Sequence, residues 1–515
     1  MGKRKILYFV KNIASGFAVL YNRHSDFFHL LKKEKEMKHI KKGLIGALSL
    51  LMLTGCSGGS EANNDKSTLN IILYDAGWGR EWLDDVITKW EKENEGYKVN
   101  LTAKYEVKTL INRHLSSKNN PDDLYITTDG GWRNYAYQGK FAPLDDLMSE
   151  TVDGVTVEEK VNDEFKPSLK MNVKGEEHVY RLPWTSGFGG IFYNAKMFEE
   201  NGWKVPETTA ELTALVKQIL ENPVEVKGDD AMSVKPFVYT GENTDYFDYT
   251  IFNWWMQLAG YDKVTDFYKY ESAENFNWQN KDSAYSSLKT VVDYWKSLFG
   301  DITIQTTDDN GNPVNDQASS YINGSLSYSN HDAQQDFFNG KAAMIFDGDW
   351  IYNETLKYGT KPEGFEMKLM KTPTFEGAKD TDVSYVIGSD QYIAVPASSK
   401  KQDLAKSFIK MMISNESLSN FTNKSHGFLA YKNTDPSSID TTNPYIKSYL
   451  DVRNSVKKTT TDDSKAEIYL NGYISNAWVA SSNRPFLGLL QQSSKTVESS
   501  FDTIYKAAQD SFSRA

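Results

Sequence analysis

The chain has 515 residues, with 58 Lys and Arg against 69 Asp and Glu, and a formal net charge of −11 at pH 7. This acidic balance argues against nucleic acid as a partner and against electrostatic binding to anionic lipid. The length exceeds what one hydrophobic core usually supports and predicts two or more domains. Aromatic residues make up 13% of the chain, a high share that leads us to expect rings facing a ligand.

The segment before the only cysteine reads as an export signal. Met37–Lys42 is basic, and the apolar run 43–53 after it is shorter than the ~20 residues of a membrane-spanning helix. Leu53-Thr54-Gly55-Cys56 resembles the bacterial lipobox. This resemblance implies cleavage before Cys56, which then carries a diacylglycerol. An ordinary secretory signal or a short anchor with a chance cysteine is the alternative.

The start of the chain therefore divides into two predicted segments. Residues 1–55 are expected to be a leader and signal peptide, with translation starting at Met37, because residues 1–36 contain mixed charges that suit a signal peptide poorly. A genuine extended basic segment is the alternative. Residues 56–68 are expected to be the lipidated cysteine and a flexible Gly/Ser/Asn-rich tether. The protein would face outward from the cell membrane, extracellular in Gram-positive bacteria or periplasmic where an outer membrane is present.

Strand and helix patterns alternate after the tether. The apolar run 69–74 predicts a buried strand, apolar residues at helical spacing over 82–90 predict a helix, and alternation over 99–103 predicts a second strand. Further strands are expected at 123–127, 190–193, 236–239, 342–346 and 392–395, and helices at 208–220, 247–258, 286–299, 398–413 and from 483 onward. The alternation predicts an α/β fold. The polar segment 300–330 is expected to be an insertion or a surface hairpin.

Four segments then carry a family resemblance: PDDLYITTDGGWRNYAYQGKFAPLDDL (121–147), YRLPWTSGFGGIFYNAKMFEENGWKVPETTAEL (180–212), FFNGKAAMIFDGDWIYNE (337–354) and YIAVPASSKKQDLAKSFIKMMISNESL (392–418). They resemble the extracellular solute-binding proteins of bacterial ABC importers, in the family that includes maltose-binding protein. The resemblance implies a two-lobed, periplasmic-binding-protein-like fold of type II that closes over its ligand at hinge crossovers. The expected lobes are 69–188 with 348–395 (lobe 1), and 189–347 with 396–515 (lobe 2).

The resemblance also implies a function. The expected protein is a monomer without a cofactor that captures a carbohydrate, expected to be an oligosaccharide, between its lobes. It delivers this ligand to a membrane permease driven by a cytoplasmic ATPase and catalyses no reaction. The alternatives are a binding protein of the same fold for a non-sugar solute or a sensor's partner and, more remotely, a secreted glycan-active enzyme using Asp347 and Asp349. A histidine-rich zinc site is not expected, because the histidines after the leader are not paired at ligand spacing.

Sugar binding needs aromatic faces for pyranose rings and planar polar groups for hydroxyls. In an open α/β sheet these groups lie just beyond the strand ends. The candidates directly after predicted strands are Trp78, Asp129, Trp132, Asp349 and Trp350. The resemblance supports Asp129, Trp132 and Trp350, and adds Tyr246 as a sugar-contacting tyrosine. Weaker candidates are Trp184, Asp390 and Arg484.

Some of these residues have alternative roles. Asp129 could instead cap a helix that begins near Trp132. Trp184 could equally pack in the core. Trp82, Trp90 and Trp295 are expected to be core residues because they recur at helical spacing.

Overall fold

The computed structural model describes residues 67–128, 131–267, 269, 271–308, 310–358, 362–386, 391–461, 489–490 and 495–513. The predictions for the leader, for most of the tether, and for Cys56, Asp129, Asp390 and Arg484 lie outside these ranges. Within them, no helix combines the length and the apolar character that crossing a membrane requires.

The first sheet has the strand order β2-β1-β3-β18-β8. Its strands are β1 (Thr68–Tyr74), β2 (Lys98–Lys104), β3 (Leu124–Thr127), β8 (Leu182–Pro183) and β18 (Tyr392–Ala394). The first three run parallel, and β18 pairs antiparallel with both β3 and β8. Alternate residues of β1 face opposite cores, with Ile71 on one side and Ile72 on the other. Burial on both faces explains why β1 is an almost continuous apolar run.

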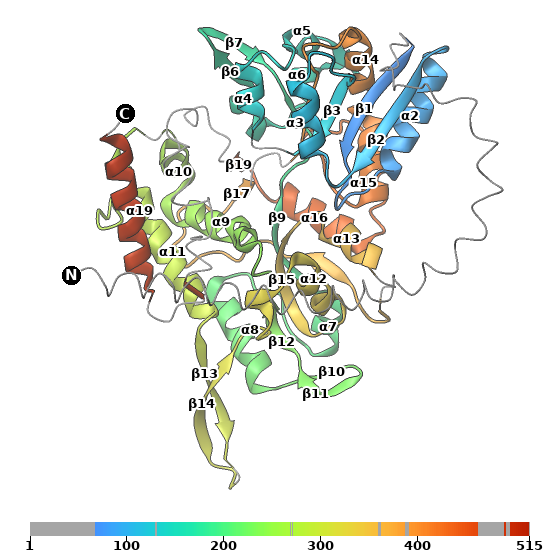
Figure 1. Ribbon diagram of the computed structural model, residues 1–515. Helices are drawn as coiled ribbons and strands as arrows, with labels where there is room; N and C mark the ends of the chain where they lie inside the picture. The colour runs from blue at the N-terminus through green and yellow to red at the C-terminus, as the bar shows by residue number, and fades with distance from the viewer. Residues whose placement is uncertain are drawn as a thin grey trace, which may run out of the picture. The chain divides into compact units, whose positions relative to one another are not determined.

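The second sheet has the order β12-β15-β9-β16. Its strands are β9 (Gly189–Asn194), β12 (Lys235–Val238), β15 (Ala342–Gly348) and β16 (Met367–Leu369). Helices α8 (Thr209–Glu221), α9 (Asp248–Ala259) and α11 (Ala284–Leu298) pack on or beside it (Figure 1). Thr208 caps α8 through a reciprocal pair of hydrogen bonds with Glu211, at the start that the sequence predicts.

The predicted lobe boundaries are wrong for two stretches. Helices α14 (Gln402–Met412) and α15 (Asn415–Ser425), expected in lobe 2, pack on α2 (Glu81–Glu93) beside the first sheet. Strand β16, expected in lobe 1, pairs with β9 of the second sheet. The chain crosses between the sheets after β8, between β16 and β18, and between α15 and α16 (Pro444–Asn454). Periodicity predicts an element but does not tell which sheet it joins.

The polar segment after α11 is a hairpin, as predicted. Strands β13 (Asp301–Thr307) and β14 (Pro313–Ser319) pair antiparallel over their whole length and extend away from the second sheet (Figure 1). A smaller parallel pair joins β17 (Val383–Val386) to β19 (Lys458–Thr461).

The remaining elements are α3 (Lys108–Ser116), α4 (Trp132–Tyr137), α5 (Asp145–Met148), β4 (Thr151–Val152), β5 (Val155–Thr156), α6 (Val157–Lys160), η2 (Asp163–Ser168), β6 (Lys170–Val173), β7 (Glu176–Val179), α7 (Ala195–Glu200), β10 (Glu225–Val226), β11 (Asp229–Ser233), η3 (Thr244–Phe247), α10 (Tyr261–Phe267), η4 (Ala273–Phe276), η5 (Ser325–Ser327), α12 (Asn330–Phe338), α13 (Ile351–Tyr358), η6 (Pro436–Ser438) and α19 (Val497–Phe512).

Candidate functional site

Four aromatic side chains meet where strands of the two sheets end. Trp78 lies in the loop after β1, and Trp350 follows β15; their ring centroids are 5.8 Å apart and nearly perpendicular. The ring of Tyr246, in η3, lies 5.4 Å from Trp350, and that of Tyr249, in α9, lies 6.3 Å away. We call these four residues the Trp350 cluster. The structure thus brings together three predicted site residues, Trp78, Tyr246 and Trp350, and adds Tyr249.

Close contacts hold the β1 loop against α13. A Cβ atom on Gly77 would lie 2.8 Å from Trp350 Cβ and 2.9 Å from Glu354 Oε1, so only glycine fits without displacing a neighbour. Asn353 Nδ2 donates to the Gly77 carbonyl oxygen, and Lys357 Nζ donates to the Ala76 carbonyl oxygen at 2.7 Å. The site therefore joins a loop of the first sheet to the helix that follows a strand of the second sheet.

Two carboxyl groups lie beside the cluster and share one donor. Gln334 Nε2, in α12, donates to Asp347 Oδ2 at 3.0 Å and to Glu354 Oε2 at 2.8 Å. Burial raises the pKa of Asp347 well above its ordinary value, and the nearby charge of Glu354 raises it further. Burial also raises the pKa of Glu354, although the Gln334 hydrogen bond and Lys357 oppose this. The pair therefore holds a proton more readily than two exposed carboxyls would.

Neutralising Glu354 should stabilise the protein most at high pH. Because folding raises the Glu354 pKa, the folded state binds the proton more tightly than the unfolded chain, and this contribution to stability is lost as pH rises above the usual glutamate range. Glu354→Gln keeps an oxygen to accept from Gln334 but cannot ionise. Its melting temperature should exceed that of the wild type by a few degrees near pH 7 and by less near pH 5. Scanning calorimetry at both pH values measures this.

The exposed Glu363 supplies the control for this prediction. Glu363→Gln should have the same melting temperature as the wild type at both pH values. The melting-temperature difference between Glu354→Gln and the wild type could instead be smaller near pH 7 than near pH 5. That result would contradict a raised Glu354 pKa in the folded state.

Asp349, predicted to bind ligand, is instead buried in a hydrogen-bonded junction. Its side chain is 0% exposed, and its Oδ2 accepts from Ser186 Oγ at 3.0 Å. Its backbone oxygen accepts from the Tyr445 hydroxyl at 2.7 Å, and its N–H donates to the Phe188 carbonyl at 3.0 Å. These contacts join β15, the crossing before β9, and α16. The structure thus favours a structural role for Asp349 over ligand contact.

Removing the Asp349 carboxylate should therefore lower stability rather than change ligand contacts directly. Asp349→Ala leaves the buried Ser186 hydroxyl without this acceptor, which we expect to cost about 2 kcal/mol of unfolding free energy. Chemical denaturation measures the loss. Ser186→Ala, which removes the other partner, should also be destabilised, because it leaves the buried Asp349 carboxylate without this donor. Equal stability of Asp349→Ala and the wild type would refute this role.

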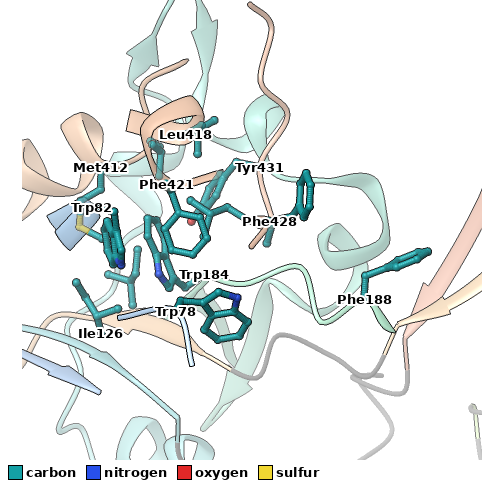
Figure 2. Close-up of a cluster of buried hydrophobic side chains, with 14 of the residues drawn as sticks. Trp78, Trp82, Ile126, Trp184, Phe188, Met412, Leu418, Phe421, Phe428 and Tyr431 are labelled. Atoms are coloured by element: carbon teal, nitrogen blue, oxygen red, sulfur yellow. The ribbon is translucent and has the colours of Figure 1, made fainter. Parts of the chain in front are cut away.

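Trp184 is a core residue. It is 1% exposed, and its ring lies 5.1 Å from Trp82, 5.8 Å from Phe421 and 6.3 Å from Tyr431. Figure 2 shows these rings around Trp184, with Trp78 at the border of the same cluster. The packing alternative to ligand binding therefore holds for Trp184. Trp82, Trp90 and Trp295 are also buried, as predicted.

Trp132 lies in a different cluster, on the side of the first sheet that includes Ile72 and Tyr392. It is 4% exposed and begins α4. The guanidinium groups of Arg181 and Arg133 lie over its ring at 4.2 and 4.6 Å from the centroid. Cation–π contact with two arginines accounts for its burial. The structure does not join Trp132 to the Trp350 cluster.

Sequence reasoning missed Tyr249, Gln334 and Glu354. A signal existed for Glu354, because it lies four residues after Trp350, and that spacing places the two side chains on one face at the start of α13. Gln334 carried no comparable signal, since its partners lie 13 and 20 residues further along the chain, in or after another strand. Among the described residues, no group of three or more His, Cys, Asp or Glu side chains is placed to hold a metal ion.

Comparisons with known proteins bear on this arrangement. Residues 76–418 match the family described as bacterial extracellular solute-binding protein. The chain is 25% identical over 382 residues to the multiple sugar-binding protein of Streptococcus mutans serotype c, covering 73% of this chain and 79% of that protein.

Solved structures share the fold. A chitin oligosaccharide binding protein is 18% identical, with a TM-score of 0.59 over 87% of this chain and 99% of that one. The MalE domain of Bdellovibrio bacteriovorus, bound to maltotriose, is 16% identical, with a TM-score of 0.55 over 87% of this chain and all of that one. The predicted α/β, two-lobed fold of type II is thereby confirmed.

Proposed function

Because the chain belongs to the family of bacterial extracellular solute-binding proteins, we propose that it captures a carbohydrate at the Trp350 cluster and delivers it to the permease of an ABC importer. The observation that carries the proposal is the meeting of Trp78 and Trp350, from the ends of strands in different sheets, beside two carboxyl groups. Aromatic faces and hydrogen-bonding carboxyl and amide groups are the two requirements of sugar recognition. The sugar-binding relatives support the same ligand class.

The proposed mechanism has no chemical step. The partly exposed ring of Trp350 stacks on the apolar face of a pyranose, and the partly exposed Glu354 exchanges hydrogen bonds with its hydroxyls. The buried Gln334 positions Glu354 through its hydrogen bond. A ligand that contacts both lobes favours the closed form by its differential affinity. The protein works as a monomer, docks closed on the permease, and releases the sugar when it reopens. The contacts of Asn353 and Lys357 with the β1 loop would stabilise the closed form.

A thermal-shift screen of the full chain tests the ligand class. A sugar that binds only the folded state raises the melting temperature by mass action. Shifts with mono- or oligosaccharides, and none with peptides or sugar acids, would support the proposal. Shifts only with a non-sugar solute would favour the alternative ligand class. Sugars that are recovered unchanged after long incubation with the protein would support binding. Sugars that are cleaved would favour the remote enzymatic alternative.

We also propose that the protein is a lipoprotein. Residues 1–55 would be removed, Cys56 would carry the lipid, and the segment that follows would tether the folded protein to the outer face of the cell membrane. The lipobox-like Leu53-Thr54-Gly55-Cys56 and the apolar run before it support this.

A further inference from the structure

Helix α12 packs against β15 and α13, and two of its amide side chains form hydrogen bonds with groups of the candidate site. Asn330 and Gln334 lie four residues apart, which places both on one face of the helix. Gln334 is buried, and Asn330 is half-buried. We call these two residues the amide face of α12.

Asn330 connects α12 to the Trp350 cluster. Its Nδ2 donates to the Tyr246 hydroxyl oxygen at 3.2 Å, and its Oδ1 accepts from Asn243 Nδ2. Because Asn243 occupies the amide oxygen, the amide nitrogen faces Tyr246, and the tyrosine oxygen acts as an acceptor. The proton of this hydroxyl has no acceptor within the part of the chain that the structure describes. The half-buried Tyr246 can therefore donate this proton to a ligand.

Gln334 makes comparable contacts one turn further along α12. Its Nε2 donates to Asp347 Oδ2 at 3.0 Å and to Glu354 Oε2 at 2.8 Å, so both hydrogens of the amide are used. The buried Gln334 thus acts on a ligand only through the carboxyl groups that it orients. The amide face of α12 therefore orients groups from three other elements, which are η3, β15 and α13.

The start of α12 is fixed by its own hydrogen bonds. Ser329 and Asp332 form a capping box, in which Asp332 N–H donates to Ser329 Oγ at 3.2 Å and Ser329 N–H donates to Asp332 Oδ2 at 3.1 Å. Asn330 lies between these two residues. Its amide is therefore held on a fixed part of the backbone before a ligand arrives.

We propose that Asn330 is a positioning residue, which holds the Tyr246 hydroxyl as a hydrogen-bond donor for an oxygen atom of the bound sugar. This inference rests on the proposed function and adds a requirement to its site. The ligand must present an acceptor to Tyr246. A hydroxyl, ether or carbonyl oxygen meets this requirement, and an ammonium group does not.

A double-mutant cycle tests this role, with calorimetric titration of maltotriose, xylotriose and chitotriose. Tyr246→Phe removes only the hydroxyl and should weaken binding of the tightest sugar about tenfold, as expected for one lost hydrogen bond. Asn330→Ala should weaken it about fivefold. In the Tyr246→Phe background, Asn330→Ala should have no further effect, because the group through which it acts is absent.

Asn330→Asp tests the direction of the hydrogen bond. Its carboxylate still accepts from Asn243 but cannot donate, so it accepts the hydrogen bond of the Tyr246 hydroxyl in place of the sugar. This variant should lose about as much affinity as Tyr246→Phe. The control is Gln335→Ala, at an exposed position of the same helix, which should bind like the wild type. Melting curves should show that all variants are folded.

Three outcomes would overturn the role of Asn330 and leave the proposed function intact. The first is an additive loss of about fiftyfold in the double variant, since Asn330 would then act independently of Tyr246. The second is wild-type affinity in Asn330→Asp. The third is an equal loss in Gln335→Ala, which would indicate a general effect on α12. A wild type that binds none of the three sugars would instead refute the proposed function, and this inference with it.

Discussion

Replacing Trp350 with alanine should weaken carbohydrate binding by about a hundredfold while leaving the protein folded. Trp350 is the centre of the Trp350 cluster, with its ring within 5.8 Å of both Trp78 and Tyr246, and it is partly exposed. Truncating an aromatic anchor of this kind typically costs about 2–4 kcal/mol of binding free energy. Calorimetric titration with the sugar identified by the thermal-shift screen measures the loss.

Another partly exposed tryptophan, outside the Trp350 cluster, serves as the control. This is Trp278, whose Nε1 donates to Asp502 Oδ1 at 2.8 Å. Trp278→Ala should leave the dissociation constant unchanged, so that a loss confined to Trp350→Ala reports on the site. Melting curves should show both variants folded. An unchanged dissociation constant in Trp350→Ala would refute the assignment of the site.

Replacing Cys56 with serine should release the protein from the membrane almost completely. A diacylglycerol supplies two acyl chains, which give stable anchoring where a single chain gives only reversible binding. Serine has no thiol to carry this lipid, and Cys56 is the only cysteine in the chain. We expect wild-type protein in the membrane fraction and Cys56→Ser in the soluble fraction or medium, as measured by immunoblotting after fractionation.

The neighbouring Ser57→Ala variant should remain with the membrane. Mass spectrometry of the membrane-bound protein should find a modified Cys56 at the N-terminus and no peptide from residues 1–55. A Cys56→Ser protein that still sediments with membranes would contradict lipid anchoring at this position. It would favour an uncleaved apolar anchor instead.

Local sequence patterns predicted most strands and helices of the two sheets. The β1 run, the α2 spacing of Trp82 and Trp90, and the Thr208 start of α8 depend on neighbours within a few residues. The fold and family also followed from sequence, because the quoted segments retain residue types at a spacing typical of that fold. The boundaries between the lobes could not be predicted from the sequence, because the residue pattern of α14 and α15 does not specify which sheet these helices pack on.

The sequence likewise predicted some residues of the candidate site correctly and not others. From sequence alone, Trp78, Tyr246 and Trp350 could be placed after strands or by resemblance, and their meeting in the structure agrees with that placement. Asp349 and Trp350 are adjacent in sequence, yet Asp349 is buried against Ser186 while Trp350 faces the cluster.

The sequence by itself therefore determined the class of the fold, the family and the aromatic character of the site. Only the tertiary structure decided which polar and aromatic side chains share the candidate site, because Gln334 and Tyr249 meet their neighbours through packing between separate elements. The burial of a side chain and its hydrogen-bond partners depend on contacts between separate elements of the chain, and local sequence patterns do not predict these contacts.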